Sequence, residues 1–201
     1  MIYIEYISRR PNVELREFHE YASKAQEGWD AGYQADQLIL YMSRTWRIGP
    51  EPEHMAVWYS PGSSFERIDD WERIFRSGEA DQYEEPLRKV ARIDAAGCYE
   101  ILLEPVRGRN GTYYAEFFRA KRELAEIGKF YEARSKQHQR FTLNLLVHRI
   151  GLLGPGPGGL AVWTIPSFAA LSEIARELDG MQQPVELEAA GTYTDAGKEI
   201  L

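Results

Sequence analysis

Cysteine and histidine are scarce in this chain. Among its 201 residues there is one cysteine, Cys98, and there are four histidines. An internal disulfide and a Cys-x-x-Cys metal or redox motif are therefore excluded. No two histidines have the i, i+4 spacing of a helical zinc site, so we expect no bound metal.

The chain also lacks long apolar runs and an excess of basic residues. No stretch approaches the ~20 apolar residues of a transmembrane helix, and residues 1–10 lack the basic start and apolar core of a secretory signal. Lysine and arginine number 24 against 31 acidic residues, which gives a net charge of −7. Nucleic-acid-binding domains instead carry a basic patch. We expect a cytoplasmic protein without membrane or nucleic-acid partners.

Standard catalytic motifs are missing as well. The glycine-rich run 154–159 lacks the Gly-Lys-Ser/Thr of a phosphate-binding loop, and its two prolines cannot donate N–H groups. No Gly-x-Ser-x-Gly elbow occurs, and Cys98 has no sequence signature of a nucleophile. The run is expected to form a hairpin loop or a flap at the mouth of a pocket.

What the chain does contain is an internal repeat of six short blocks in the same order. The blocks begin at Tyr3, Glu14, Arg47, Ala56, Ser64 and Ala95 in the first copy, and at Tyr114, Glu123, Arg149, Ala161, Ser167 and Ala189 in the second. The offset between copies falls from 111 to 94 residues, as deletions in the second copy would produce. We therefore predict two repeats, 1–106 and 107–201, joined by the polar link 107–111.

The two copies differ in charge. Residues 1–105 carry 12 basic and 20 acidic side chains, a balance of −8, whereas residues 106–201 carry 12 and 11, a balance of +1. We expect the acidic excess to lie mainly on solvated helix faces. The difference itself is typical of duplicated halves that have diverged.

Each copy predicts the element order strand, helix, strand, strand, helix, strand. The expected strands are 2–8, 38–48, 55–59 and 99–103 in the first copy, and 113–119, 141–150, 160–164 and 185–193 in the second. The expected helices are 14–29 and 64–75, then 121–138 and 166–178. This order is the ferredoxin-like βαββαβ unit, whose bare sheet face must be covered. We predict an α+β fold of tandem ferredoxin-like repeats that form a pseudo-dimeric α/β barrel.

The repeats resemble the dimeric α/β-barrel superfamily and, within it, the NIPSNAP-like proteins. The similarity lies in Ile4-Glu5-Tyr6, Pro11 and Glu14–Phe18, and again in Val57-Trp58-Tyr59 before Phe65-Glu66-Arg67. It implies a pocket between sheet and helices. The superfamily includes cofactor-free monooxygenases, muconolactone-type isomerases and haem proteins of the chlorite-dismutase type, whereas NIPSNAP-like members have no settled common chemistry.

Glu5 and Glu116 occupy equivalent places on the first strand of each copy, which is central in its sheet. A carboxylate there is costly to bury without a partner. One hypothesis is a general base whose pKa is raised by burial. The other is a structural ion pair, for which the repeated Arg47 and Arg149 are the natural partners, or a carboxylate that reaches solvent.

The second strand of the second copy carries polar groups on one face. This face is formed by every second residue of the strand, namely Thr142, Asn144, Leu146 and His148. The first-copy positions taken as equivalent are Leu40, Met42, Arg44 and Trp46. This asymmetry favours the second copy as the working half, with Glu116 and His148 as acid/base groups and Asn144 holding an oxyanion. The alternative is that this face is simply a wetter edge strand.

Aromatic residues are plentiful, and several of them lie on strands. Trp58, Tyr114 and Trp163 either pack in the core or line a cavity for a flat apolar ligand, together with Glu5, Arg47 and Arg149. The first hypothesis is a cofactor-free enzyme that acts on a small hydrophobic or aromatic molecule by proton transfer, isomerisation or monooxygenation. The second is a non-catalytic NIPSNAP-like ligand-binding or assembly protein.

A haem-binding barrel is a remote third hypothesis. His138, near the end of a predicted helix, would need a deep apolar pocket opposite to serve as a haem ligand. His19 and His54 are expected to be solvated. We expect no cofactor, and a homo-oligomer remains open.

Overall fold

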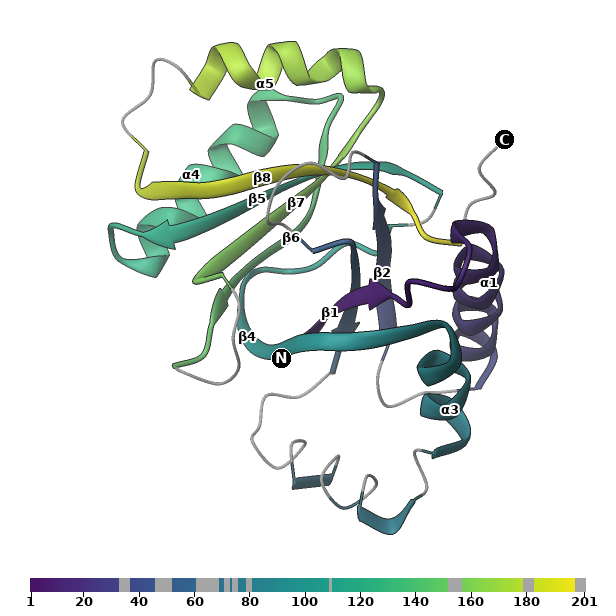
Figure 1. Ribbon diagram of the computed structural model, residues 1–201. Helices are drawn as coiled ribbons and strands as arrows, with labels where there is room; N and C mark the ends of the chain where they lie inside the picture. Colours follow the sequence, from purple (N-terminus) through teal and green to yellow (C-terminus); the bar gives the residue numbers. More distant parts are fainter. Residues whose placement is uncertain are drawn as a thin grey trace.

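The computed structural model describes residues 1–32, 37–45, 52–60, 69–70, 73, 76–78, 81–108, 110–151, 157–178 and 183–197 (Figure 1). The strands are β1 (Ile2–Arg9), β2 (Gln37–Arg44), β3 (His54–Tyr59), β4 (Ala91–Leu103), β5 (Thr112–Ala120), β6 (Thr142–Arg149), β7 (Gly159–Ile165) and β8 (Val185–Asp195). The helices are α1 (Leu15–Gly32), α3 (Asp81–Val90), α4 (Leu124–Gln137) and α5 (Leu171–Leu178), with a 3-10 turn at Phe168–Ala170. Most of the predicted helix 64–75 lies outside the described residues.

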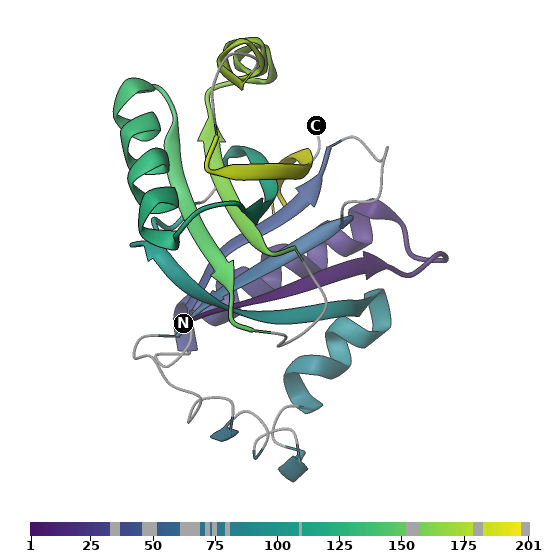
Figure 2. The same ribbon diagram turned by 90° about the vertical axis from the view of Figure 1, so that its left-hand side faces the viewer.

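The strands close into one barrel in the order β1-β3-β2-β8-β5-β7-β6-β4. Its described pairings are all antiparallel. Strand β1 lies between β3 and β4, and β5 lies between β7 and β8; the two groups meet where β2 pairs with β8 and β4 pairs with β6. The helices lie outside the barrel (Figures 1 and 2). The predicted α+β barrel is therefore confirmed.

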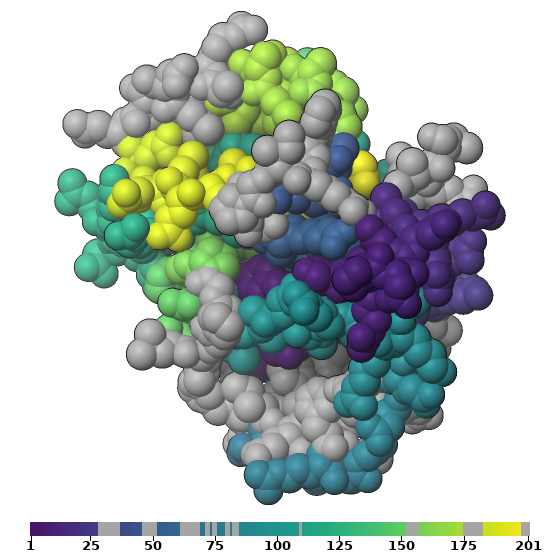
Figure 3. Space-filling model, viewed as in Figure 1, coloured from purple at the N-terminus to yellow at the C-terminus, as the bar shows by residue number. Residues whose placement is uncertain are grey.

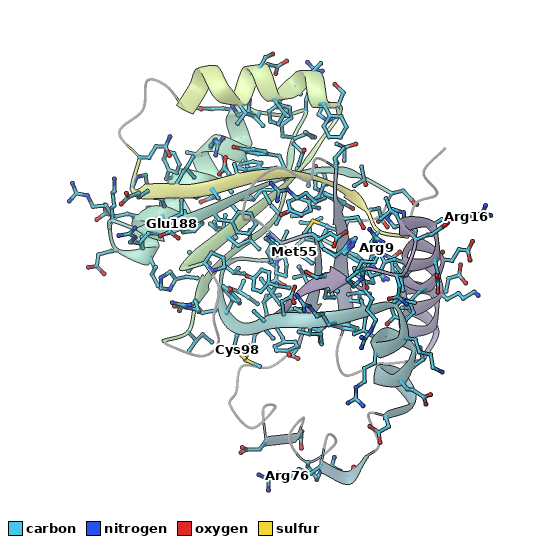
Figure 4. The ribbon with its side chains drawn as sticks, in the orientation of Figure 1. Arg9, Arg16, Met55, Arg76, Cys98 and Glu188 are labelled. Atoms are coloured by element: carbon cyan, nitrogen blue, oxygen red, sulfur yellow. The ribbon has the colours of Figure 1, made fainter. Side chains whose placement is uncertain are left out.

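Side chains that alternate along the strands pack the barrel interior. They include Ile4, Tyr6, Met42, Met55, Val57, Tyr99, Tyr113, Phe117, Val147, Val162 and Tyr193. Met55 lies near the centre of the molecule, whereas Arg16 and Glu188 project from its edges (Figure 4). The Tyr6 and Tyr99 hydroxyls share a hydrogen bond of 2.6 Å, which satisfies polar groups that are otherwise costly to bury. A ligand site therefore has to be sought outside this packed interior.

Two further apolar clusters lie between the barrel wall and the helices. The cluster under α1 contains Ile7, Phe18, Ala22, Tyr41 and Ala56. The cluster under α4 and α5 contains Phe118, Ile127, Tyr131, Trp163 and Ile174. In the space-filling view the purple atoms of the first half lie on the right, and the green and yellow atoms of the second half lie at the top and left (Figure 3). Each half thus has its own apolar cluster between strands and helix.

Two elements differ from the prediction. Strand β4 begins at Ala91 rather than near Tyr99, and α3 precedes it directly. Helix α3, which was not among the predicted helices, contains Pro86, although proline removes a backbone donor from a helix interior. In the second half, α5 ends at Leu178 and β8 begins at Val185.

The strand registers correct one sequence alignment. Arg149 lies opposite Tyr99, and Arg44 lies opposite Tyr193. Arg44 is therefore the positional counterpart of Arg149, and the match to Arg47, which lies outside the described residues, was wrong by three residues. By the same register His148 corresponds to Ser43 rather than to Trp46.

Among the described residues, none of the helices has the length and apolar character needed to cross a bilayer.

Candidate functional site

Glu116 lies on β5 and points at α4, where it is fully buried. One guanidinium nitrogen of Arg134, Nη1, donates to both carboxylate oxygens at 2.8 and 2.9 Å. The Tyr131 hydroxyl donates to Oε2 at 2.9 Å. The Arg134 guanidinium also lies over the Trp163 ring, 5.0 Å from its centroid. This carboxylate therefore contacts a cation and a phenol, and the cation in turn lies over an indole.

The local sequence of α4 explains this arrangement. Ile127, Tyr131 and Arg134 follow the i, i+4, i+7 spacing of one helix face, and all three are buried against the strands. Glu116 is thus in an ion pair, and its partner is Arg134 and not the expected Arg149. An arginine on the apolar face of a helix was the signal that could have identified it.

Asn144 also forms hydrogen bonds with neighbouring parts of the fold. Its Nδ2 donates to the Val106 carbonyl at 3.1 Å, and its Oδ1 accepts from Thr164 Oγ1 at 2.6 Å. Its backbone carbonyl accepts from the Val106 N–H as well. A register irregularity between Leu143 and Leu145 interrupts the alternation expected for this strand. The side chain therefore ties β6 to the segment after β4.

His148 lies apart from both of these residues. Its Nδ1 is 3.3 Å from Glu100 Oε1, on the neighbouring strand β4, and its side chain is partly exposed. The structure does not assemble Glu116, Asn144 and His148, since each of them contacts different partners.

The counterpart of Glu116 in the first half has a different environment. Glu5 lies on β1, is half-buried, and accepts a hydrogen bond of 3.1 Å from Trp58 Nε1 on β3. Tyr21 of α1 and Trp58 both pack against the apolar cluster under α1. Burial raises the pKa of Tyr21, and the nearby Glu5 charge raises it further. The structure thus brings Glu5, Trp58 and an aromatic side chain of α1 together.

The two helix faces explain why the environments differ. Residues 15–22 of α1 and 124–131 of α4 have the same sequence of buried and exposed positions. In this register Ala22 of α1 corresponds to Tyr131, and Ala25 corresponds to Arg134. Glu116 and Trp163 are 0% and 2% exposed, whereas Glu5 and Trp58 are both half-buried. Glu5 is therefore partly exposed as a residue, whereas Glu116 is not.

His54 and His19 were wrongly expected to be solvated. His54 is 1% exposed; its Nδ1 is 2.8 Å from Ser43 Oγ, and its ring stacks on Phe18 at 3.9 Å. It is buried because it begins β3 rather than ending a turn. His19 is buried on α1, where the neighbouring Gln26 donates to Asp195 of the chain's last strand.

The remaining predicted residues lie in two places. Tyr114 is buried on the same face as Glu116, and burial, followed by the Glu116 charge, raises its pKa. Arg149 is half-buried beside Tyr99, on the side of the wall that faces the barrel interior. Its charge partly offsets the raised pKa of Tyr99, for which burial is the main cause.

The haem hypothesis depends on a histidine ligand, and three of the histidines have the following contacts. His148 faces Glu100, His54 bonds to Ser43, and His138 stacks on Phe141 at 5.0 Å. Beside Glu116 the space between helix and strands is occupied by the side chains that enclose it. No group of three metal-ligating side chains occurs among the described residues, and burial raises the pKa of the Cys98 thiol, which disfavours a thiolate ligand.

No family model matches the chain, and no curated protein matches it. Solved structures match its fold. One, described as a "putative chlorite dismutase", has 12% identity and a TM-score of 0.58, with 98% of this chain and 95% of that chain covered. A "putative monooxygenase" from Lactobacillus acidophilus has 14% identity and a TM-score of 0.54, with 96% and 91% covered.

A third match is a single-residue variant of the chlorite dismutase from Candidatus Nitrospira defluvii. It has 9% identity and a TM-score of 0.53, with 96% of this chain and 90% of that chain covered. At these identities the likeness shows the fold alone. It supports the predicted ferredoxin-like, dimeric α/β-barrel fold.

Proposed function

We propose that this protein binds a small aromatic molecule between the barrel wall and α1, with Glu5 as its hydrogen-bond and proton acceptor. One observation carries the proposal. The hydrogen-bonded Glu5 and Trp58 are half-buried, while the residues at the matching strand positions of the second half, Glu116 and Trp163, are buried under α4. Ligand sites combine apolar and aromatic walls with a few fixed polar groups, as this place does.

The chemistry available there is proton transfer. A carboxylate oriented by an indole N–H can take a proton from a hydroxyl or an acidic C–H group and return it at another atom of the same molecule. Such an isomerisation needs no further reactant. Monooxygenation by the same base would need molecular oxygen as a second substrate. The match to a structure described as a monooxygenase supports small-molecule chemistry on this fold without specifying it.

The proposal moves the working site from the second half to the first. Glu116, Asn144 and His148 then have structural roles, because their polar atoms contact Arg134, Val106 and Glu100 respectively. The second candidate function is a non-catalytic, NIPSNAP-like binding protein. It would use the same Glu5 site without turnover, and a product analysis separates the two.

We also propose that residues 1–106 and 107–201 are tandem repeats. Register irregularities fall at matching places, between Leu38 and Leu40 and between Leu143 and Leu145. Hydrogen bonds also match at the two places where strands of different halves meet. The Thr45 N–H donates to the Thr192 carbonyl at 2.9 Å, and the Ile150 N–H donates to the Cys98 carbonyl at 3.0 Å. A homo-oligomer stays a separate prediction, which native mass spectrometry tests.

The binding proposal is tested by isothermal titration with 1-naphthol and with 1-naphthoate. The neutral phenol is expected to bind, because it donates to Glu5, and the anion is expected not to bind, because Glu5 repels it. A hydrogen bond to a charged group contributes about 1.5–3 kcal/mol, so Glu5→Gln should weaken 1-naphthol binding by roughly 10- to 100-fold.

The matched control is Glu100→Gln, which removes a carboxylate charge from an exposed position on the neighbouring strand. It should leave the affinity for 1-naphthol unchanged. Equal affinity of the wild type and the Glu5→Gln variant for 1-naphthol, with both folded, would overturn the proposal.

A further inference from the structure

We infer that two copies of this chain associate through the first part of β4, residues 91–97, which pair antiparallel with Ile93 at the two-fold centre. This surface is separate from the proposed ligand site and gives the predicted homo-oligomer a defined contact. Two features of β4 point to it: one side of this segment has no strand partner among the described strands, and its exposed charges alternate in sign.

Strand β4 extends beyond one of its two neighbours. Residues 91–99 lie along β1 on one side, whereas the pairing with β6 on the other side begins only at Tyr99. Next to it, the Ile150 N–H donates to the Cys98 carbonyl at 3.0 Å. Among the described strands, none pairs with residues 91–97 on that side, and this segment leads away from α3 (Figure 1). Such a strand edge presents N–H and C=O groups that can pair with another chain.

The side chains at the middle of this edge are exposed. They are Arg92, Ile93 and Asp94, and Ile93, at 40%, is one of three large apolar side chains that are exposed among the described residues. Arg92 Nε lies 2.6 Å from Asp94 Oδ1, and the Ser8 hydroxyl donates to Asp94 Oδ2. Arg92 and Asp94 therefore lie on one face of the strand. Ile93 lies opposite Ile7, which belongs to the apolar cluster under α1.

An antiparallel pair centred on Ile93 places unlike charges opposite each other. Arg92 of each copy faces Asp94 of the other copy, so the pair contains two such contacts. Ile93 faces its own copy, and Ala91 faces Ala95. Opposite charges across antiparallel strands are stabilising, and like charges are destabilising. Because the same patch is used by both copies, the contact gives a closed dimer and not a filament.

The corresponding edge of the second half lacks this complementarity. Residues 185–191 of β8 lie along β5, and the pairing with β2 on the other side begins only at Tyr193. The exposed charged side chains of this edge are Glu186 and Glu188, which are both acidic. A pair of such edges centred on Leu187 would place Glu186 opposite Glu188 twice. Charge thus favours self-pairing of the β4 edge and opposes it at the β8 edge.

Analytical ultracentrifugation of the full chain over a range of concentrations tests the inference, and the wild type is expected to form a dimer. Arg92→Asp and Asp94→Arg each put two like-charge pairs into the contact. Each should weaken dimerisation about tenfold or more, and thermal melts check that the variants are folded. The matched control is Glu188→Arg on the β8 edge, which changes the charge as Asp94→Arg does and should leave the dimer unchanged.

Mixing the two variants identifies the contact itself. Arg92→Asp carries two acidic residues on the edge and Asp94→Arg carries two basic ones, so an equimolar mixture should form a heterodimer, which native mass spectrometry recognises by its mass. The double variant with Arg92→Asp and Asp94→Arg should dimerise with itself, and it provides the test if a single variant does not fold.

Three results would overturn the inference. They are a wild type that is monomeric at every concentration, a dimer that both charge reversals leave unchanged, and a double variant that stays monomeric where the wild type is a dimer.

Discussion

The enclosed ion pair between Glu116 and Arg134 gives the sharpest stability prediction. Replacing Arg134 by methionine keeps much of its apolar stem and removes the charge. Glu116 would then be a fully buried carboxylate whose cationic partner is gone. Breaking a buried pair in this way costs about 3–5 kcal/mol, because the remaining charge is uncompensated. We expect Arg134→Met to lower the free energy of unfolding by that amount.

The magnitude can be checked in two ways. Urea denaturation measures the change in the free energy of unfolding, and thermal denaturation should show a fall of about 2–4 °C for each kcal/mol lost. The double variant Glu116→Leu with Arg134→Met should lose much less than the sum of the single variants, since a buried pair replaced by apolar groups is often neutral.

The control for this experiment is Arg140, whose ion pair with Glu173 is exposed and 3.5 Å long. Exposed pairs contribute about 0–1 kcal/mol, so Arg140→Ala should change stability little. Two results would refute this reasoning about the Glu116–Arg134 pair. One is a loss of unfolding free energy below about 1 kcal/mol in Arg134→Met, and the other is simple additivity in the double variant.

Three further predictions follow from the same geometry. Trp163→Ala should destabilise the protein by about 3–5 kcal/mol, whereas Trp58→Ala, at a half-buried site, should cost less, as thermal melts will show. Ala25→Arg should abolish 1-naphthol binding without lowering the melting temperature, because the new guanidinium would cover Glu5; the charge-matched Glu27→Gln should bind normally. Cys98, buried and with its pKa raised by burial, should react with iodoacetamide more slowly at pH 8 than a free thiol; equal rates would contradict its placement.

Much of the fold could be predicted because strand alternation is a local property. The repeated pattern around Val57-Trp58 and Val162-Trp163 indicated both strands, and β3 and β7 lie there. The helix beginning near Leu124 was predicted from its apolar spacing. Helix α3, with Pro86 inside it, was not among the predicted helices. Register was harder, since a similar Arg-Ile-Gly triplet aligned Arg149 with Arg47, while the strand pairing aligns it with Arg44.

The candidate site could be predicted only in part. Glu5 and Glu116 were identified because a carboxylate on a central strand needs an explanation. Their difference could not be predicted from the strands, since it depends on whether the helix above presents alanine or arginine at the matching position. That comparison depends on how the two helices align. The burial patterns of α1 and α4 in the structure show that Ala25 and Arg134 occupy corresponding positions.

The central proposal is that a ligand binds at the Glu5 site and not at the Glu116 site. The most direct measurement is the stoichiometry and affinity of 1-naphthol binding to the wild type and to Glu5→Gln. We predict one molecule per chain, with the affinity reduced about tenfold or more by the substitution. Two molecules per chain, or an affinity that Glu5→Gln leaves unchanged, would contradict the account.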